Sequence, residues 1–301
     1  MRLVLFRFFS LFLAFTLIFF LLRVLPGDYL DAQIAEGNLS PQLATEYRQQ
    51  LGLDQPLLLQ YVRNIGQIFS GDFGISIARR IPVSLLLEGA VQATFQLAVL
   101  SLGLATVIGL LLGSLANSPD RNVARVASFV ITIIQATPVY WVATWFIIAA
   151  GWLISPASPL LHNLYDTQLP VLTLGLTSSG GIARVTQSAL QQAFQLDAIR
   201  TARAKGLRRW QIFIRHVLRL AFPSILTVIG LQAGFLLSGT FIIEAIFARP
   251  GVGSILYDAV LNRDYPVVQA VVLLSSILYV AINLVLDVLQ SWSDPRIRSV
   301  A

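Results

Sequence analysis

The stretch Asp197–Pro223, DAIRTARAKGLRRWQIFIRHVLRLAFP, is a basic segment between two long apolar runs. It contains seven of the chain's 21 Lys and Arg residues, and His216 lies among them. Membrane proteins concentrate Lys and Arg in their cytoplasmic loops, so this stretch is predicted to be such a loop. A loop with this much charge is typical of a surface that meets a partner.

Two short helices are expected inside the basic loop. Asp197 is a suitable N-cap for the first, and Gly206 is expected to end it in the left-handed conformation that glycine adopts at low cost. The second is expected to run from Leu207 to Pro223, because proline lacks the amide donor that would continue it. Apolar residues at helical spacing predict one continuous stripe on this second helix: Trp210, Phe213, Ile214, Val217 and Leu218.

The composition indicates an all-α polytopic membrane protein. Of 301 residues, 56% are hydrophobic and 12% are charged, about half the charged fraction of a typical soluble domain. A helix needs about 20 apolar residues to cross the hydrocarbon core. The fourth candidate is the weakest, because Arg184 lies inside it and the run Ser178–Gly181 interrupts it. Six transmembrane helices are predicted, over residues 3–25, 91–116, 126–154, 169–190, 220–243 and 265–286.

The distribution of Lys and Arg predicts the orientation. With both termini cytoplasmic, fourteen of these residues lie inside, whereas the short outer loops hold only Arg249 and Arg263. The resulting organisation has a first transmembrane helix (1–25), a periplasmic segment (26–90), a five-helix core (91–292) that includes the cytoplasmic loop 191–222, and a cytoplasmic tail (293–301).

The N-terminal apolar run has a second interpretation as a cleaved signal peptide. Arg7 interrupts the run, and no small-x-small cleavage site precedes Leu25–Asp28, so we expect it to remain as the first membrane helix. The segment after it is expected to hold two short helices. One begins at Ser40–Pro41 and ends at Gly52, and the other follows Asp54–Pro56 with a stripe of Leu58, Tyr61, Ile65 and Ile68. Such a segment is too small for a large core of its own, so we expect it to pack on the outer mouth of the membrane domain.

The residue types exclude several classes of enzyme. The sequence has no GxxxxGK[ST] phosphate loop, no GxSxG elbow and no HExxH motif, and it contains no cysteine. Its two histidines, His162 and His216, are expected on opposite sides of the membrane, so no metal site and no catalytic residue is predicted. Glu244 and Asp287 are interpreted as helix-end charges near the interface, with a catalytic or substrate-binding role as the alternative. The net charge of +6 fits the anionic inner face of a membrane better than a nucleic acid.

Several motifs together resemble a known family over nearly the whole chain. The chain is similar to the inner-membrane permease subunits of ABC importers in the dipeptide, oligopeptide and nickel family. The resemblance rests on these blocks, in the family's order: Leu25–Asp28, Leu51–Pro56, Gly71–Gly74, Thr137–Trp141, Arg200–Leu207, Glu244–Phe247, Pro250–Gly253, Asn262–Pro266 and Asp294–Arg296. It implies the type I, binding-protein-dependent permease fold.

The resemblance also implies a coupling role for the basic loop. The family's cytoplasmic signature is an EAA segment with a glycine six positions after its first residue, and here Gly206 places Arg200, Thr201 and Ala202 at the first three positions. This departs from the literal Glu-Ala-Ala. In such importers this helix docks on a separate ATPase and moves with it. The residues implied to couple this chain to the ATPase are Asp197, Arg200, Thr201, Ala202, Arg203, Lys205 and Gly206, with Ala202 and Ala204 allowing close approach. An interfacial helix held only by anionic lipid is the alternative.

The partners implied by the resemblance are a second, similar permease subunit or a second copy of this chain, two ATPases that carry ATP and Mg²⁺, and a periplasmic or lipid-anchored solute-binding protein. The chain itself is expected to bind no cofactor and to lie in the bacterial inner membrane. The cargo stays open between a dipeptide, a longer peptide, nickel, glutathione and another solute. A secondary transporter and a membrane scaffold with a lipid-binding basic loop are the competing functions; internal repeats or a buried ionisable coupling site would favour the former.

Polar residues inside the predicted helices are candidates for lining the transport pathway, and interhelical hydrogen bonds are the alternative role for each. They are Gln96, Gln135, Thr137, Ser178, Ser179 and Gln232. Two pairs of glycines at small-xxx-small spacing, Gly109 with Gly113 and Gly230 with Gly234, are predicted to allow close helix packing, including packing against a second permease subunit.

Overall fold

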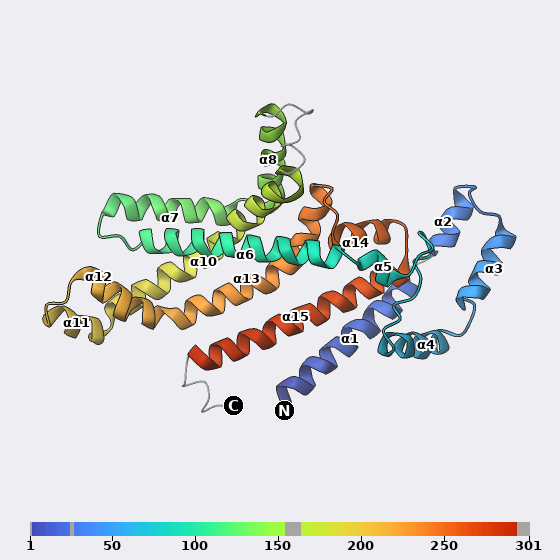
Figure 1. Ribbon diagram of the computed structural model, residues 1–301, viewed down its shortest axis with the longest axis horizontal. Coiled ribbons are helices and arrows are strands. Elements are labelled where there is room, and N and C mark those ends of the chain that lie inside the picture. The colour runs from blue at the N-terminus through green and yellow to red at the C-terminus, as the bar shows by residue number, and fades with distance from the viewer. Residues whose placement is uncertain (1, 25–26, 154–163, 294–301) are drawn as a thin grey trace. The chain divides into compact units, whose positions relative to one another are not determined.

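A computed structural model describes residues 2–24, 27–153 and 164–293, and within them the regular structure is helical (Figure 1). Two segments pair outside the helices, through an isolated antiparallel bridge between Ile75 and Pro82. The motif residues Leu25 and Pro26, His162 and the tail 294–301 lie outside the described residues. The all-α prediction is confirmed.

The chain divides into two units, residues 1–93 with 250–280 and residues 94–249 with 281–301. The first unit holds α1 (Arg2–Val24), α2 (Tyr29–Ala35), α3 (Pro41–Leu51), α4 (Leu57–Phe69), α5 (Val83–Leu87), α14 (Val252–Leu261) and the first part of α15 (Tyr265–Ser293). The second holds most of α6 (Ala90–Leu115), α7 (Arg121–Ala136), α8 (Val139–Leu153), η1 (Leu164–Gln168), α10 (Leu169–Gln195), α11 (Asp197–Ala204), α12 (Arg209–Ile212), η2 (Phe213–Val217), α13 (Leu218–Ile246) and the rest of α15.

In the first unit, the segment between α1 and α6 is tied to residues that follow it by almost two hundred positions. The carboxylate of Asp264 is buried and accepts hydrogen bonds from the Ser76 hydroxyl and from the amides of Ile77 (3.2 Å) and Ala78 (3.2 Å). Tyr265 donates its hydroxyl to the carbonyl of Gly27 at 2.7 Å. These bonds explain why residues 250–280 belong to this unit rather than to the core predicted over 91–292.

The two helices expected in the outer segment form as α3 and α4. Ser40 caps α3 by accepting from the amide of Leu43, and Gly52 ends it with a φ of +69°. Helix α4 packs on α1 through Tyr61, which meets Phe15, Phe19 and Phe20 and hydrogen-bonds Thr16 at 2.7 Å. The stripe predicted for α4 is wrong at Leu58, which is 72% exposed. Gln60 is buried in its place, because its amide group bonds the carbonyls of Leu53 and Gln55.

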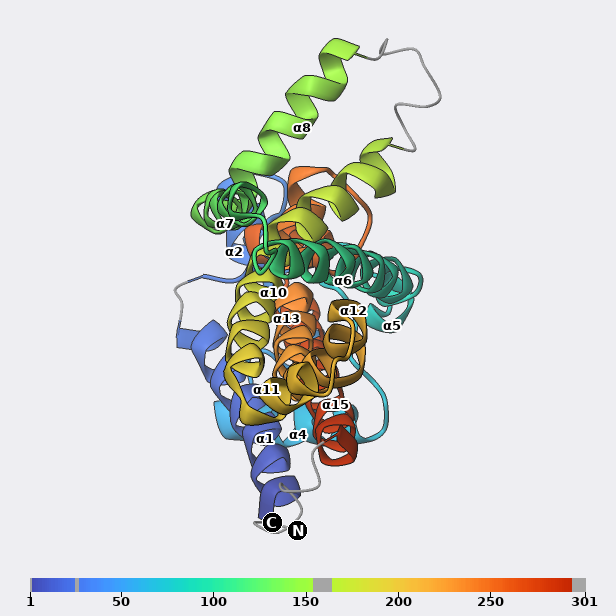
Figure 2. The same ribbon diagram turned by 90° about the vertical axis from the view of Figure 1, so that its left-hand side faces the viewer.

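In the second unit, α10 and α13 run side by side, as Figures 1 and 2 both show. Glycines allow the helices of this unit to approach closely. A Cβ on Gly109 or Gly113 of α6 would come within 3 Å of Ile182 or Thr186 of α10, and one on Gly230 would overlap Leu286 of α15. The packing role predicted for these three glycines is confirmed. The neighbours that these three glycines approach belong to the same chain.

The third predicted transmembrane segment, 126–154, is not one straight helix. Helices α7 and α8 meet at an angle of 97° (Figure 2). Thr137 ends α7 with extended backbone, φ −90° and ψ 120°, because Pro138 disfavours the helical conformation of the residue before it. The segment is therefore a bent pair of helices rather than a single rod.

By length and composition, four helices within the described residues are long and apolar enough to cross a membrane, or five if the α7–α8 pair is one span. The fourth predicted segment forms the continuous 27-residue helix α10, which runs without interruption through Gly180 and Gly181. It does not meet the same criterion of apolarity, in accord with Arg184 and the polar run Ser178–Gly181 inside it. The described residues thus support a polytopic membrane protein with four or five apolar spans, and the predicted count of six is not confirmed.

Candidate functional site

The short helix α11 follows α10 almost directly. Leu196 separates the two with extended backbone, φ −70° and ψ 146°, and its amide bonds the carbonyl of Ala193. The prediction that Asp197 caps α11 is wrong, because the chain turns one residue earlier and Leu196 occupies the cap position without a side-chain hydrogen bond. Asp197 lies in the first turn, where a carboxylate favours the helix dipole, and pairs with Arg200 at 3.1 Å.

The glycine after α11 has the predicted conformation. Gly206 has a φ of +76°, and its amide bonds the carbonyl of Arg203 at 3.0 Å. A Cβ at this position would meet nothing within 4 Å. The backbone conformation alone therefore favours glycine here, and a side chain would point into open space.

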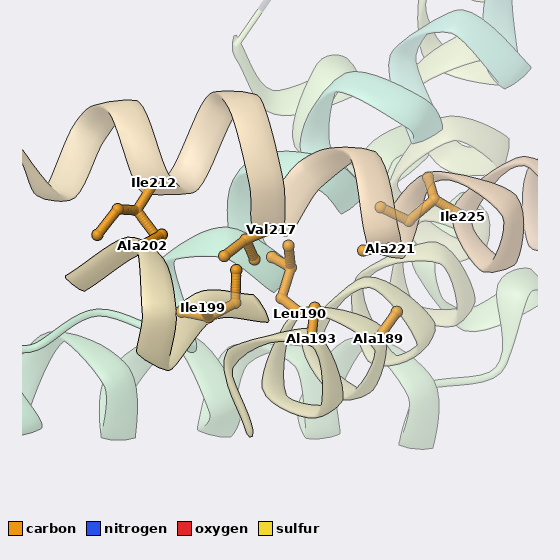
Figure 3. Packing of buried hydrophobic residues seen from close by; sticks show 9 residues of the cluster. All are labelled: Ala189, Leu190, Ala193, Ile199, Ala202, Ile212, Val217, Ala221 and Ile225. Atoms are coloured by element: carbon orange, nitrogen blue, oxygen red, sulfur yellow. The ribbon is translucent and has the colours of Figure 1, made fainter. Parts of the chain in front are cut away.

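The inner face of α11 rests on an apolar seat. Ile199 is fully buried and Ala202 is 4% exposed. Figure 3 shows both directed toward side chains from the end of α10, from α12 and from η2. We call this group the α11 seat; it consists of Ala189, Leu190, Ala193, Ile199, Ala202, Ile212, Val217, Ala221 and Ile225. Helix α11 contacts α10, α12 and η2 directly, and Ala221 and Ile225 extend the α11 seat into α13.

A π-helical turn leads from the α11 seat into α13. The predicted helix from Leu207 to Pro223 is wrong in two respects: the segment 213–217 is π-helical, and α13 continues through Pro223 to Ile246. The wider π turn shifts the buried face to Ile212, Val217 and Ala221, because it adds about one residue to the turn. Trp210 and Ile214, which the regular spacing placed on the stripe, are 57% and 54% exposed.

The opposite face of α11 is basic and exposed. Arg200, Arg203 and Lys205 lie on it with Thr201, and Arg208 and Arg209 continue the exposed positive charge beyond Gly206. Guanidinium groups donate paired hydrogen bonds to carboxylates, so this face matches an acidic surface. The prediction that Ala202 allows close approach to a partner is wrong, because Ala202 is buried in the α11 seat. Ala204 is exposed and retains that interpretation.

The residues proposed for the pathway are only partly brought together. Gly180 and Gly181 of α10 lie against Gln135 of α7 and Gln232 of α13 respectively, so two of the predicted glutamines flank one point of α10. Ser178 and Ser179 lie in the turn of α10 just before that point. Ser179 is fully buried and donates to the carbonyl of Leu176 at 2.6 Å.

The two other candidates are placed elsewhere. Thr137 donates to the carbonyl of Ile133 at 2.8 Å, one turn earlier in α7, so its hydroxyl is used within its own helix. Gln96 is exposed on α6. The group that the structure brings together is therefore Gln135, Gln232 and the α10 turn Ser178–Gly181.

A buried charged group was missed by the sequence prediction. Glu244, interpreted as a helix-end charge near the interface, is fully buried. Its carboxylate accepts from the Thr94 hydroxyl at 2.6 Å and pairs with Arg249 at 3.6 Å. Arg249 also donates to the carbonyl of Asp166. The available signal was the spacing of Glu244 and Arg249 across the end of α13, where the Arg249 amide bonds the Glu244 carbonyl at 2.9 Å.

The chain is similar in sequence to known transport proteins. A family model described as "Binding-protein-dependent transport system inner membrane component" matches residues 105–299. The glutathione transport system permease protein GsiC of Escherichia coli (strain K12) is 36% identical over 295 residues, which cover 96% of this chain and 95% of that protein. The di/tripeptide transport system permease protein DppB of Pseudomonas aeruginosa is 33% identical over 314 residues, covering 94% of this chain and 93% of that protein.

The fold also resembles that of solved transporters. A chain of the inward-facing MetNI methionine ABC transporter superposes with a TM-score of 0.59 at 22% sequence identity, covering 70% of this chain and 97% of that one. A chain of an amino acid ABC transporter crystallised with histidines gives a TM-score of 0.55 at 17% identity, covering 69% of this chain and 94% of that one. At these identities the likeness concerns the fold.

Proposed function

Since this chain belongs to the family of inner-membrane components of binding-protein-dependent transport systems, we propose that it takes up short peptides or a related small solute as one permease subunit of an ATP-driven importer. Members of this family are transport components, so the chain is not an enzyme, and ATP hydrolysis belongs to separate ATPase subunits. The relatives named for di/tripeptide and glutathione transport support a peptide-like cargo.

The observation that carries the proposal is the two-sided character of α11. Its apolar face is buried in the α11 seat, and its exposed face carries Arg200, Arg203 and Lys205. A helix held to lipid alone would turn its apolar residues toward the bilayer. Ile199 and Ala202 are instead covered by this chain, which supports a protein partner over the interfacial alternative.

The structure suggests how a movement of α11 would reach the pathway. An ATPase that binds the basic face of α11 and moves would pull α11 with it. The rest of the α11 seat would also move, because Ile199 and Ala202 of α11 are packed against it. The seat includes residues of α10 and of the start of α13, which run side by side. Both helices would then move together, and they carry Gly180, Gly181 and Gln232, with Gln135 of α7 against Gly180.

The proposed assembly contains a second permease, either a homologous subunit or a second copy, two ATPases that bind ATP and Mg²⁺, and a periplasmic or lipid-anchored solute-binding protein. The family places the chain in the inner membrane. We propose that both termini and the loop 191–222 are cytoplasmic and that the segment 26–90 is periplasmic, in accord with the distribution of Lys and Arg.

Reconstitution tests the proposal directly. The full chain in liposomes is expected neither to hydrolyse ATP nor to accumulate labelled dialanine. Addition of the second permease and both ATPases should give ATP hydrolysis, and the solute-binding protein with dialanine should stimulate it. Dialanine uptake by the chain alone, driven by an ion gradient, would contradict the proposal in favour of a secondary transporter.

A further inference from the structure

The first unit contains a polar cavity that the coupling mechanism does not use. It has a volume of about 240 Å³ and lies between the end of α1, the helices α3 and α4 and the start of α15. Among the residues that line it are Arg23, Gln60, Arg63, Asn64, Asp72 and Gln269. All of them belong to residues 1–93 or 250–280, so the cavity lies within one unit.

Two buried polar atoms at this cavity lack hydrogen-bond partners within the described residues. They are the amide nitrogen Nε2 of Gln269 and the amide oxygen Oδ1 of Asn64. Gln269 is only 4% exposed, so bulk water does not reach its side chain freely. A buried polar group without a partner costs about 1–3 kcal/mol, and such groups are normally satisfied by protein, water or a ligand. A donor and an acceptor are therefore available to an occupant.

The charge around the cavity favours an anionic group. Arg23 is held in place, because its Nε donates to Gln60 Oε1 at 3.1 Å and its guanidinium lies 3.6 Å from the centre of the Phe19 ring. A guanidinium has five N–H donors, so these contacts leave others for an occupant. Arg63 is exposed beside Gly52. Asp72 is the single carboxylate among the lining residues, and it accepts the amide of Gly74 at 2.8 Å.

We propose that this cavity binds the carboxylate end of a small solute, such as the C-terminal residue of a short peptide, before the solute enters the membrane pathway. Arg23 and Arg63 contact the carboxylate, the Gln269 amide donates to it, and Asn64 Oδ1 accepts an N–H of the same solute. The volume suits the end of a peptide rather than a whole drug-sized ligand. The inference rests on the proposed peptide import and on the periplasmic position of the segment 26–90, and it adds a place where the carboxylate is recognised.

The absence of cysteine allows a binding test that requires neither ATPase nor solute-binding protein. A single cysteine is introduced as Gln67→Cys, at the lining of the cavity, in the full chain in phosphatidylcholine nanodiscs. Its rate of reaction with a charged methanethiosulfonate reagent is measured with millimolar dialanine and with the C-terminal amide of dialanine. Dialanine should slow the reaction several-fold and the amide should not. Gln42→Cys, on an exposed part of α3 outside the cavity, should react at one rate throughout.

Substitutions of the lining residues complete the test. Arg63→Gln should raise the dialanine concentration needed for half-maximal protection by roughly tenfold, and Arg63→Lys by less, because a charge-assisted bond is lost in the first case and weakened in the second. Arg63 is exposed, so neither change is expected to disturb the fold. Asn64→Asp should also weaken protection, because it adds a negative charge at the cavity.

Three outcomes would overturn the inference. Equal protection by dialanine and its amide would exclude recognition of the carboxylate. If neither dialanine nor its amide changed the reaction rate of the cysteine at position 67, the cavity would hold only water. A rate that falls only when phosphatidylglycerol replaces phosphatidylcholine would place a lipid headgroup there. None of these outcomes bears on ATPase binding. The proposal of peptide import is tested separately, by the reconstitution experiment.

Discussion

Ile212 and Val217 lie five positions apart in the chain and share one buried face, because the π-helical turn Phe213–Val217 separates them. In a regular α-helix, residues three or four positions apart share a face. Ile212 is 4% exposed and Val217 is fully buried, and both belong to the α11 seat. The π turn thus allows α12 and α13 to contribute to one apolar surface beneath α11. Single π turns of this kind occur frequently at functional sites.

The first prediction concerns this packing. Ile212→Ala removes a buried side chain from the α11 seat and should destabilise the region by about 2–5 kcal/mol. Loosened packing should expose the backbone at Arg200 and Arg203, so trypsin should cleave the folded chain faster at these two residues. Ile214→Ala is the matched control, because Ile214 is 54% exposed, and it should leave the rate nearly unchanged. Equal cleavage rates in the two variants would show that the seat does not hold α11.

The second prediction concerns the left-handed residue after α11. Gly206→Val should misdirect the chain between α11 and α12, because a side chain at a φ of +76° costs roughly 1 kcal/mol or more, with an added penalty for a β-branched residue. We expect ATPase binding and dialanine uptake to fall while the inserted protein stays near its normal level. Gly206→Asn is the control, because asparagine tolerates this conformation and no neighbour lies within 4 Å of its Cβ. Normal uptake by the valine variant would contradict the coupling role of this turn.

The third prediction concerns charge on the exposed face of α11. Arg203→Glu replaces a donor by a group that repels an acidic partner, so the amount of ATPase that co-purifies with the chain should fall several-fold, most clearly at low salt. Arg121→Glu makes the same change at an exposed residue at the start of α7 and should have little effect. If both reversals reduced ATPase binding equally, the partner would be responding to net cytoplasmic charge rather than to α11.

Local rules were enough to predict much of the helical fold. The positions of α3 and of the break at Gly206 follow from Ser40 as a cap and from glycines that accept positive φ. The bend at Thr137 also had a local signal, since the residue before a proline favours extended backbone. The long apolar run 126–154 nevertheless led to the prediction of a single helix. Apolarity alone does not distinguish a straight helix from a bent pair.

The parts that failed depend on distant contacts. The π turn at 213–217 keeps Val217 in the α11 seat, and its packing partners include Leu190 and Ile199 from other helices. Pro223 lies inside α13, and helices in membranes tolerate proline where other groups satisfy the freed backbone carbonyl. The burial of Glu244 likewise depends on Thr94, which is 150 positions away in the chain. No local pattern specifies these contacts, so the surface on which α11 rests could not be predicted from the sequence.

The fourth prediction concerns orientation. Single cysteines introduced as Ser70→Cys and Asn262→Cys should react in intact cells with a thiol reagent that does not cross the inner membrane. Asn122→Cys and Ser299→Cys should react only after lysis, because the excess of Lys and Arg keeps their segments in the cytoplasm. Ser70, Asn122 and Asn262 are exposed, so accessibility within the chain does not limit the reaction at these three. Labelling of Asn122→Cys in intact cells would contradict the proposed orientation.

The last prediction concerns the buried pair of Glu244 and Arg249. Glu244→Gln removes the negative charge 3.6 Å from a guanidinium that is 6% exposed, so the positive charge stays buried without its carboxylate. Loss of one partner of a buried pair costs about 3–5 kcal/mol, and we expect a clear fall in the temperature of unfolding of the purified chain. Glu244→Gln combined with Arg249→Met should recover part of that loss, because the positive charge of the pair is then removed as well. Asp258→Asn is the matched control: its pair with Arg79 is half-exposed on both sides, and such pairs contribute about 0–1 kcal/mol. A double variant that is less stable than Glu244→Gln alone would show that Arg249 stabilises the region chiefly through its bond to the Asp166 carbonyl rather than through Glu244.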